Sequence, residues 1–177
     1  MRRLILPFIP RWVSPNYVTI ARLISIPFVI WFLLQKNYAV GIPLFIISAF
    51  TDALDGSIAR VRNRITRWGT FYDPVADKLL IGSAVLIVVA THLSAWFAAI
   101  ILLMEALIAV GGYVYRREGK MQSANAWGKA KMFAQFCGIT LLLLAIAGNF
   151  SALIPVAAAA LAVGVLLAVI SLFTYGL

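Results

Sequence analysis

The sequence predicts an all-α protein embedded in a membrane, with six transmembrane helices. Of its 177 residues, 63% are hydrophobic and only 12% are charged, whereas soluble domains carry about 25% charged residues. Residues 79–104 and 132–177 contain no Asp, Glu, Lys or Arg, and each stretch exceeds the ~20 apolar residues that cross a bilayer. This composition excludes intrinsic disorder, a large domain outside the membrane and, with Cys137 as the single cysteine, a secreted disulfide scaffold.

The N-terminal segment, residues 1–15, is expected to form a short helix in the membrane interface. Its apolar run is short, and Pro7 and Pro10 interrupt it, which is unlike the uninterrupted core of a cleaved signal peptide. Basic residues mixed with large apolar ones are typical of an interfacial element.

Six transmembrane spans then follow, separated by short polar or basic breaks. We expect all of residues 1–177 to form a single membrane domain, because the spans leave little chain for loops. The predicted spans cover residues 17–35, 38–60, 72–92, 94–115, 127–147 and 151–174.

Basic residues indicate how the bundle is oriented. With six spans, one side holds fourteen of them and the other side holds Lys36 alone, so the positive-inside rule predicts that the rich side, with both termini, is cytoplasmic. We therefore expect a multi-pass protein of the cell's inner membrane. Because the net charge of +9 mainly reflects this topology, no nucleic-acid partner is expected. The fourteen are Arg2, Arg3, Arg11, Arg22, Arg60, Arg62, Arg64, Arg67, Lys78, Arg116, Arg117, Lys120, Lys129 and Lys131.

Four of the six acidic residues lie within 26 positions, at the cytoplasmic ends of the second and third spans. Asp52 and Asp55 are three residues apart, and Asp73 and Asp77 are four apart, so each pair lies on one helix face. Because the two spans are antiparallel neighbours, the two faces can meet. Carboxylate oxygens favour hard cations such as Mg²⁺, Mn²⁺ or Ca²⁺, and the sequence therefore predicts a divalent metal site.

Helix capping and ion pairing would each account for only some of these acids. Asp73 before Pro74 could cap a helix, and Asp52 and Asp55 could pair with Arg60 or Arg64. Neither alternative requires two same-face pairs on consecutive helices, and ionisable residues at the edge of a span are usually functional. A divalent-cation transporter would continue the polar residues through the bilayer, whereas the outer halves of these spans are apolar; a non-catalytic scaffold would leave the spacing unexplained.

The acids also belong to a longer pattern. It reads Asp52-Ala-Leu-Asp55-Gly56-Ser-Ile-Ala59-Arg60, then eight residues, Gly69, three residues, Asp73, three residues, Asp77. This pattern resembles the signature of the CDP-alcohol phosphatidyltransferase family at every fixed position. Three further stretches are similar to bacterial members of the family: Pro15 to Thr19 with Arg22, Phe71 to Lys78, and Gly128 to Lys131.

The resemblance implies an enzyme that transfers a phosphatidyl group from CDP-diacylglycerol to an alcohol and releases CMP. It implies two divalent ions, Mg²⁺ or Mn²⁺, with Asp52, Asp55 and Asp73 as ligands and Asp77 as both ligand and catalytic base. Small side chains beside the acids could equally serve close helix packing, and Gly69 could permit the turn before the third span. The positions that resemble CDP-lipid contacts are Gly56, Ala59, Arg60, Thr66, Gly69, Asn16 and Thr19.

Four basic residues are candidates for binding a phosphate of the acceptor: Lys129, Lys131, Arg116 and Arg22. They could instead be orientation signals or contacts to lipid headgroups. Small bacterial members of the family are commonly phosphatidylglycerophosphate synthases, which use glycerol 3-phosphate, and the resemblance favours this acceptor.

The fourth span departs from the pattern of those synthases. They carry Arg-Glu followed by another Arg, where this chain has Met104-Glu105 and then Gly111-Gly112. An acceptor such as phosphatidylglycerol, as in cardiolipin synthases, or inositol phosphate is therefore the alternative. Glu105 either pairs with a cation from another span, which we favour, or lines the acceptor pocket.

The last span contains an alanine run, Ala157 to Ala160, and Gly164. Small residues allow helices to approach closely in a membrane, so we expect close helix contact here and a homodimer. Membrane lipids are the other expected partners.

Overall fold

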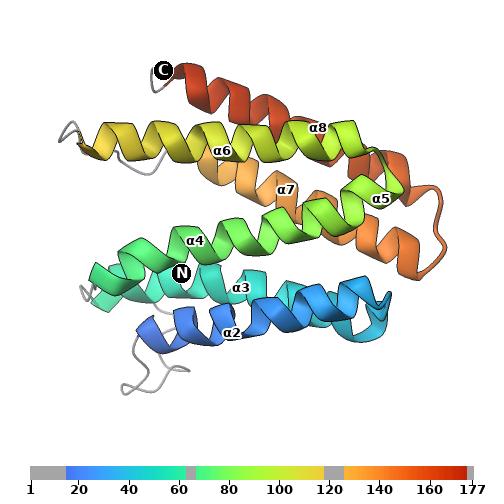
Figure 1. The fold of residues 1–177 in the computed structure, drawn as a ribbon, viewed down its shortest axis with the longest axis horizontal. Helices are drawn as coiled ribbons and strands as arrows, with labels where there is room; N and C mark the ends of the chain where they lie inside the picture. The colour runs from blue at the N-terminus through green and yellow to red at the C-terminus, as the bar shows by residue number, and fades with distance from the viewer. Residues whose placement is uncertain (1–14, 63–66, 118–125, 175–177) are drawn as a thin grey trace. The chain divides into compact units, whose positions relative to one another are not determined.

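The computed structural model describes residues 15–62, 67–117 and 126–174, and this part of the chain consists of helices and short turns without a strand (Figure 1). Side chains are described for residues 20–51, 75–114, 117 and 126–174. The expected interfacial helix lies outside the described residues. The chain divides into two compact units, residues 1–80 and 81–177.

The first unit contains a helical hairpin of α2 (Pro15–Leu34) and α3 (Tyr38–Arg62), which lie antiparallel in Figure 1. Lys36 closes the turn with a φ of 55°. The backbone N–H of Asn37 donates a hydrogen bond to the carbonyl oxygen of Phe32 at 2.9 Å, and the backbone N–H of Lys36 donates one to the carbonyl oxygen of Leu33 at 3.1 Å. This pair of bonds is a Schellman motif, which satisfies the last carbonyls of a helix without help from side chains.

A buried seam joins α2 to α3. Val29 and Leu33 on α2 and Phe45 on α3 are almost completely buried. Among these apolar residues lies one polar contact, in which the hydroxyls of Ser25 and Ser48 are 2.9 Å apart. Since Ser25 donates its proton to the carbonyl of Arg22, Ser48 is the donor to Ser25.

The third predicted span differs from the structure at its start. Helix α4 (Arg67–Ala84) begins five residues before the predicted start at residue 72. Asp73 therefore lies inside the helix and does not cap it, and Gly69 lies inside the helix and not in a turn before it. Both interpretations of this boundary were wrong, because residues 67–71 extend the helix beyond its apolar part.

A π-helix, η2 (Val85–Val89), continues α4 into the three-residue α5 (Ala90–His92). A π-turn is a wider turn than that of an α-helix. Thr91 donates its hydroxyl proton to the carbonyl of Ile87 at 2.6 Å, so a side chain adds to the hydrogen bonding at this irregularity. The span was therefore predicted correctly at its end, residue 92, but the π-helical turn within it was not foreseen.

The second unit contains the end of this segment together with α6 (Ala95–Arg117), α7 (Ala126–Ala147) and α8 (Leu153–Thr174). Helices α7 and α8 form its most closely packed pair. A Cβ on Gly138 would lie 2.7 Å from Cγ of Leu161 and 3.1 Å from its backbone nitrogen. The glycine therefore permits the close approach of α7 to α8.

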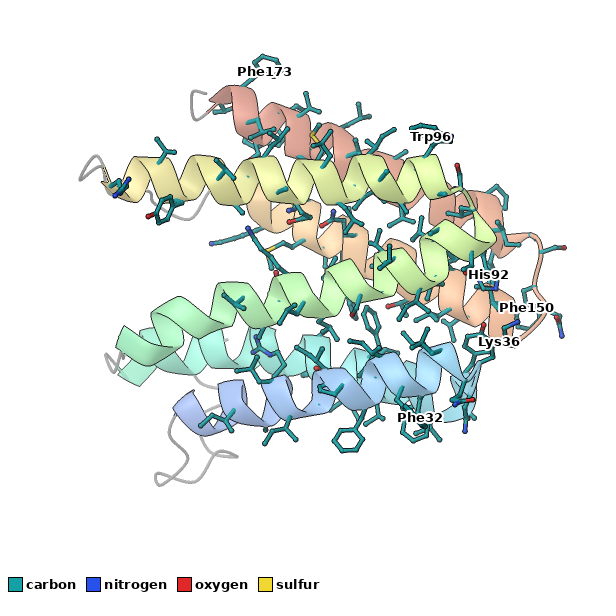
Figure 2. All side chains as sticks on the ribbon, in the orientation of Figure 1. Phe32, Lys36, His92, Trp96, Phe150 and Phe173 are labelled. Carbon is teal, nitrogen blue, oxygen red and sulfur yellow. The ribbon has the colours of Figure 1, made fainter. Side chains whose placement is uncertain are left out.

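A second Schellman motif closes the turn between α7 and α8. Asn149 has a φ of 55°, and the amide of Phe150 bonds to the carbonyl of Ala145 at 2.8 Å. Phe150, labelled at this turn in Figure 2, covers Gly148, where a Cβ would collide with the ring.

Within the described part of the chain, four segments are long and apolar enough to cross a membrane: Val75–His92, Ala95–Val114, Ala126–Ala147 and Leu153–Thr174. The apolar helical stretches Ile20–Leu34 and Tyr38–Thr51 are shorter. Large apolar side chains are exposed along the helices; Phe173, which projects from the end of α8 in Figure 2, is 85% exposed. These features are those of an all-α, multi-pass membrane protein, since water would penalise such a surface.

Candidate functional site

The four predicted metal ligands lie on two consecutive helices. Asp52 and Asp55 belong to α3, and Asp73 and Asp77 belong to α4. Asp52 lies one helical turn after Ser48, which is buried against α2, so the register of α3 places both residues on one face. The side chains of Asp52, Asp55 and Asp73 lie outside those described.

Asp77 is the one predicted ligand whose side chain is described. It is half-buried, between the fully buried Ala76 and the half-buried Lys78. Both Asp77 and Lys78 take part in interactions with other groups. Among the described side chains, no three Asp, Glu, His or Cys groups come together, and those side chains include only this one of the four acids. The metal site therefore stays a prediction.

For the residues predicted to contact CDP-lipid, the structure gives the position of the backbone but not of the side chains. Gly56, Ala59 and Arg60 lie in the last turns of α3, Gly69 lies near the start of α4, and Asn16 and Thr19 lie in the first turns of α2. Their side chains, and all of Thr66, lie outside the described part of the structure.

The two lysines of the predicted acceptor site differ in environment. Lys129 is exposed, whereas the side chain of Lys131 is 5% exposed. Residues two apart on a helix point in different directions, so the sequence motif does not present two equivalent cations. Arg116 lies in the last turn of α6, and its side chain is outside those described.

Lys131 forms an ion pair with Glu105 of α6. Its Nζ donates to Oε1 of Glu105 at 2.5 Å, and the glutamate side chain is 15% exposed. This contact confirms the favoured prediction that Glu105 pairs with a cation from another span. It also joins α6 to α7 within the second unit.

Arg22 and Gln135 are also buried. Arg22, the remaining acceptor candidate, is only 1% exposed and is engaged in interactions. Gln135, which was not among the predicted residues, lies one turn after Lys131 on α7 and is 2% exposed. Its spacing of four from a lysine, within an otherwise apolar span, was the signal that could have revealed it.

Comparison with known proteins assigns the chain to a protein family. The family described as CDP-alcohol phosphatidyltransferase matches residues 12–170, which include most of both units. This chain belongs to the CDP-alcohol phosphatidyltransferase family. The resemblance inferred from the motif is therefore confirmed, and the protein is a phosphatidyltransferase enzyme.

Individual relatives show similarity over most of the family domain. A Bacillus subtilis (strain 168) protein named CDP-diacylglycerol–glycerol-3-phosphate 3-phosphatidyltransferase is 36% identical over 146 residues, covering 73% of this chain and 76% of its own. A protein of the same name from Salmonella choleraesuis (strain SC-B67) is 38% identical over 138 residues, covering 73% and 75%.

A third relative carries a different name. The Drosophila melanogaster protein named probable cardiolipin synthase (CMP-forming) is 35% identical over 104 residues, which cover 58% of this chain and 32% of that protein. Relatives with two different names thus share more than 30% identity with this chain over the matched residues.

Proposed function

We propose that this enzyme transfers the phosphatidyl group of CDP-diacylglycerol to the primary hydroxyl of glycerol 3-phosphate. The names of the Bacillus and Salmonella relatives, at 36% and 38% identity, carry this proposal. The acceptor oxygen forms a bond to the phosphorus that bears the diacylglycerol, the bond from that phosphorus to CMP breaks, and CMP leaves.

The proposed chemistry assigns roles to the acids of α3 and α4. Asp77 accepts the proton of the attacking hydroxyl, and Asp52, Asp55 and Asp73 would hold two divalent ions, Mg²⁺ or Mn²⁺, together with Asp77. Oxygen-only donors fit such hard cations. When bound, divalent ions would offset the negative charge of the pyrophosphate and of the departing CMP.

Other residues of the motif would hold the nucleotide. A guanidinium and a hydroxyl, as on Arg60 and Thr66, can both engage phosphate oxygens. Gly56, Ala59 and Gly69 would leave space for the nucleotide, and Asn16 and Thr19 would contribute from α2. The exposed Lys129 suits the acceptor phosphate better than the buried Lys131 does, and Arg116 and Arg22 are the other candidates.

The proposed topology has six spans in the cell's inner membrane, with the acids and both termini in the cytoplasm. Six helical segments support it, because each coincides closely with a predicted span. The distribution of fourteen basic residues against Lys36 supports the orientation. The homodimer stays a prediction.

Phosphatidylglycerol is the second candidate acceptor. The similarity to the probable cardiolipin synthase favours it, as does the presence of Met104 and Gly112 at positions near which an arginine was expected. The reaction and the motif would be unchanged, and only the acceptor would differ.

The decisive experiment is an acceptor panel with purified full-length protein. CDP-diacylglycerol is supplied with Mg²⁺ or Mn²⁺, and CMP release is measured with glycerol 3-phosphate, phosphatidylglycerol, inositol phosphate, inositol or serine. We expect glycerol 3-phosphate to give the highest kcat/KM. Faster release with phosphatidylglycerol would replace the first acceptor by the second, and no release with any acceptor would contradict the reaction.

A further inference from the structure

We propose that Arg22 is a positioning residue of the metal site, whose guanidinium supplies the positive charge that holds the carboxylate of Asp52 before a divalent ion binds. The inference rests on the metal site of the proposed function. It gives Arg22 a role other than the phosphate binding that the sequence suggested. The residues that carry it all lie in the first unit, residues 1–80.

Arg22 is a buried arginine on α2. It is 1% exposed and takes part in interactions with other groups. A guanidinium stays protonated in proteins, and a buried charge is stable only when opposite charge or hydrogen bonds offset its lost hydration. An orientation signal or a contact to lipid headgroups would lie at the membrane surface, so the burial of Arg22 argues against both roles.

The contact between Ser25 and Ser48 determines which residues of α2 and α3 face each other. Their hydroxyl oxygens are 2.9 Å apart, and the two helices run antiparallel (Figure 1). Arg22 lies three residues before Ser25, and Asp52 lies four residues after Ser48, so each is one turn from its serine on the same face. In antiparallel helices these two steps lead toward the same end of the hairpin. The register therefore places positions 22 and 52 next to each other.

The side chain of Asp52 lies outside those described, and its placement comes from the backbone of α3. The hydrogen bonds around it show that the two helices are close at this level. Thr51 donates its hydroxyl proton to the carbonyl of Ser48 at 2.7 Å, and Ser25 donates to the carbonyl of Arg22 at 2.8 Å. Serine side chains are short, so two of them meet only where helix backbones approach closely. An arginine side chain is long enough to cross such a distance.

The first unit offers few negative charges for Arg22. The acidic residues within residues 1–80 are the four predicted metal ligands, Asp52, Asp55, Asp73 and Asp77. A carboxylate partner from this unit must therefore belong to the proposed metal site. The register of α2 and α3 favours Asp52 among the four.

A fixed positive charge has two opposite effects on a site of this kind. Carboxylates brought together without a cation repel one another, and a nearby guanidinium reduces that repulsion and restrains the ligand that it contacts. The same charge opposes an incoming divalent cation. Arg22 should therefore stabilise the metal-free protein and lower its affinity for metal, whereas a residue that only packs would not change the metal affinity.

The test measures binding of Mn²⁺ to metal-free, full-length protein in detergent. Electron paramagnetic resonance gives the Kd for Mn²⁺, and thermal unfolding is followed with and without the ion. Without metal, Arg22→Met should unfold at a lower temperature than wild-type protein. It should bind Mn²⁺ about tenfold more tightly, because one nearby positive charge has been removed. Arg22→Lys keeps the charge and should keep the wild-type Kd.

A double-mutant cycle identifies the partner of Arg22. Removing one member of a buried ion pair leaves an uncompensated charge, whereas removing both does not. Adding Asp52→Asn to Arg22→Met should therefore raise the unfolding temperature of the metal-free protein. The double variant also preserves the test if Arg22→Met alone does not fold. Failure of Asp52→Asn to restore stability would overturn the inference.

Val29→Ala is a matched control for packing, because Val29 is fully buried on the same helix. It should lower the unfolding temperature and leave the Kd for Mn²⁺ unchanged. The same behaviour in Arg22→Met would overturn the inference alone, as would a raised KM for glycerol 3-phosphate with an unchanged Kd for Mn²⁺, which would return Arg22 to the acceptor site. No binding of Mn²⁺ by wild-type protein would overturn the proposed metal site as well.

Discussion

Asp77 lies four residues after Asp73 on α4 and one residue after the fully buried Ala76. Its half-buried position suits a base that must meet a substrate and remain partly shielded from water. A carboxylate among cations is a weak base, but the metal ions proposed here would also make the attacking hydroxyl more acidic.

Replacing Asp77 by asparagine tests the proposed base. Asp77→Asn keeps the size of the side chain but cannot accept a proton, so kcat should fall by about 10²- to 10⁴-fold. Binding of CDP-diacylglycerol, measured by equilibrium binding or thermal shift, should persist because the other three acids remain. Wild-type turnover in this variant would exclude Asp77 as the base.

Single residues also show how far sequence reasoning extends. A cation from another span was predicted as the partner of Glu105, but the identity of Lys131 was not. The two residues are 26 positions apart on different helices, and their meeting depends on how α6 and α7 are rotated within the second unit. Rotation of this kind depends on three-dimensional packing and cannot be read from hydropathy.

At the scale of elements, hydropathy predicted the helices well and their ends less well. The six helical segments among the described residues were all predicted, because long apolar runs separated by polar breaks identify spans directly. Helix α4 begins at Arg67 and α6 ends at Arg117, both beyond their predicted limits. Hydropathy identifies only the part of a helix that is apolar enough to contact lipid. The backbone hydrogen bonds of the same helix continue into the neighbouring polar residues, so the helix is longer than its apolar part.

The contact between α7 and α8 makes a prediction about Gly138. In Gly138→Ala the new methyl group would lie 2.7 Å from Cγ of Leu161, and the helices must separate. We expect a loss of about 1–3 kcal/mol, typical of overpacking, measured by thermal unfolding in detergent.

Gly82 offers a matched control for that substitution. A Cβ there would lie 3.6 Å from Cδ2 of Leu102, an ordinary contact. Gly82→Ala should therefore be neutral or stabilise the protein by up to about 1 kcal/mol, from helix propensity. If Gly138→Ala and Gly82→Ala changed the unfolding free energy equally, close packing against α8 would not explain why residue 138 is a glycine.

For the whole molecule, composition alone identified the environment. The exposed apolar side chains, including Trp31, Phe50 and Leu166, would be unfavourable in water but suit contact with lipid. The candidate catalytic site could be predicted only as a pattern of acids, because the distances between carboxylates on different helices depend on how the bundle is assembled.

The proposed orientation can be measured by cysteine labelling. In a Cys137→Ala background, single cysteines are placed at Lys36, Asn149 and Lys129, and intact cells are treated with a membrane-impermeant maleimide. We expect labelling at positions 36 and 149, and at position 129 only after permeabilisation, because of the basic residues on the inner side. Labelling of position 129 in intact cells would contradict this topology.

The Schellman turns have a consequence for how the protein is made. Each is closed by bonds among neighbouring backbone groups around Lys36 or Asn149, so neither hairpin needs a distant part of the chain to form its turn. Contacts close in sequence form early. Each of these hairpins, α2 with α3 and later α7 with α8, can therefore form as soon as both of its helices have been synthesised, before the rest of the chain is complete.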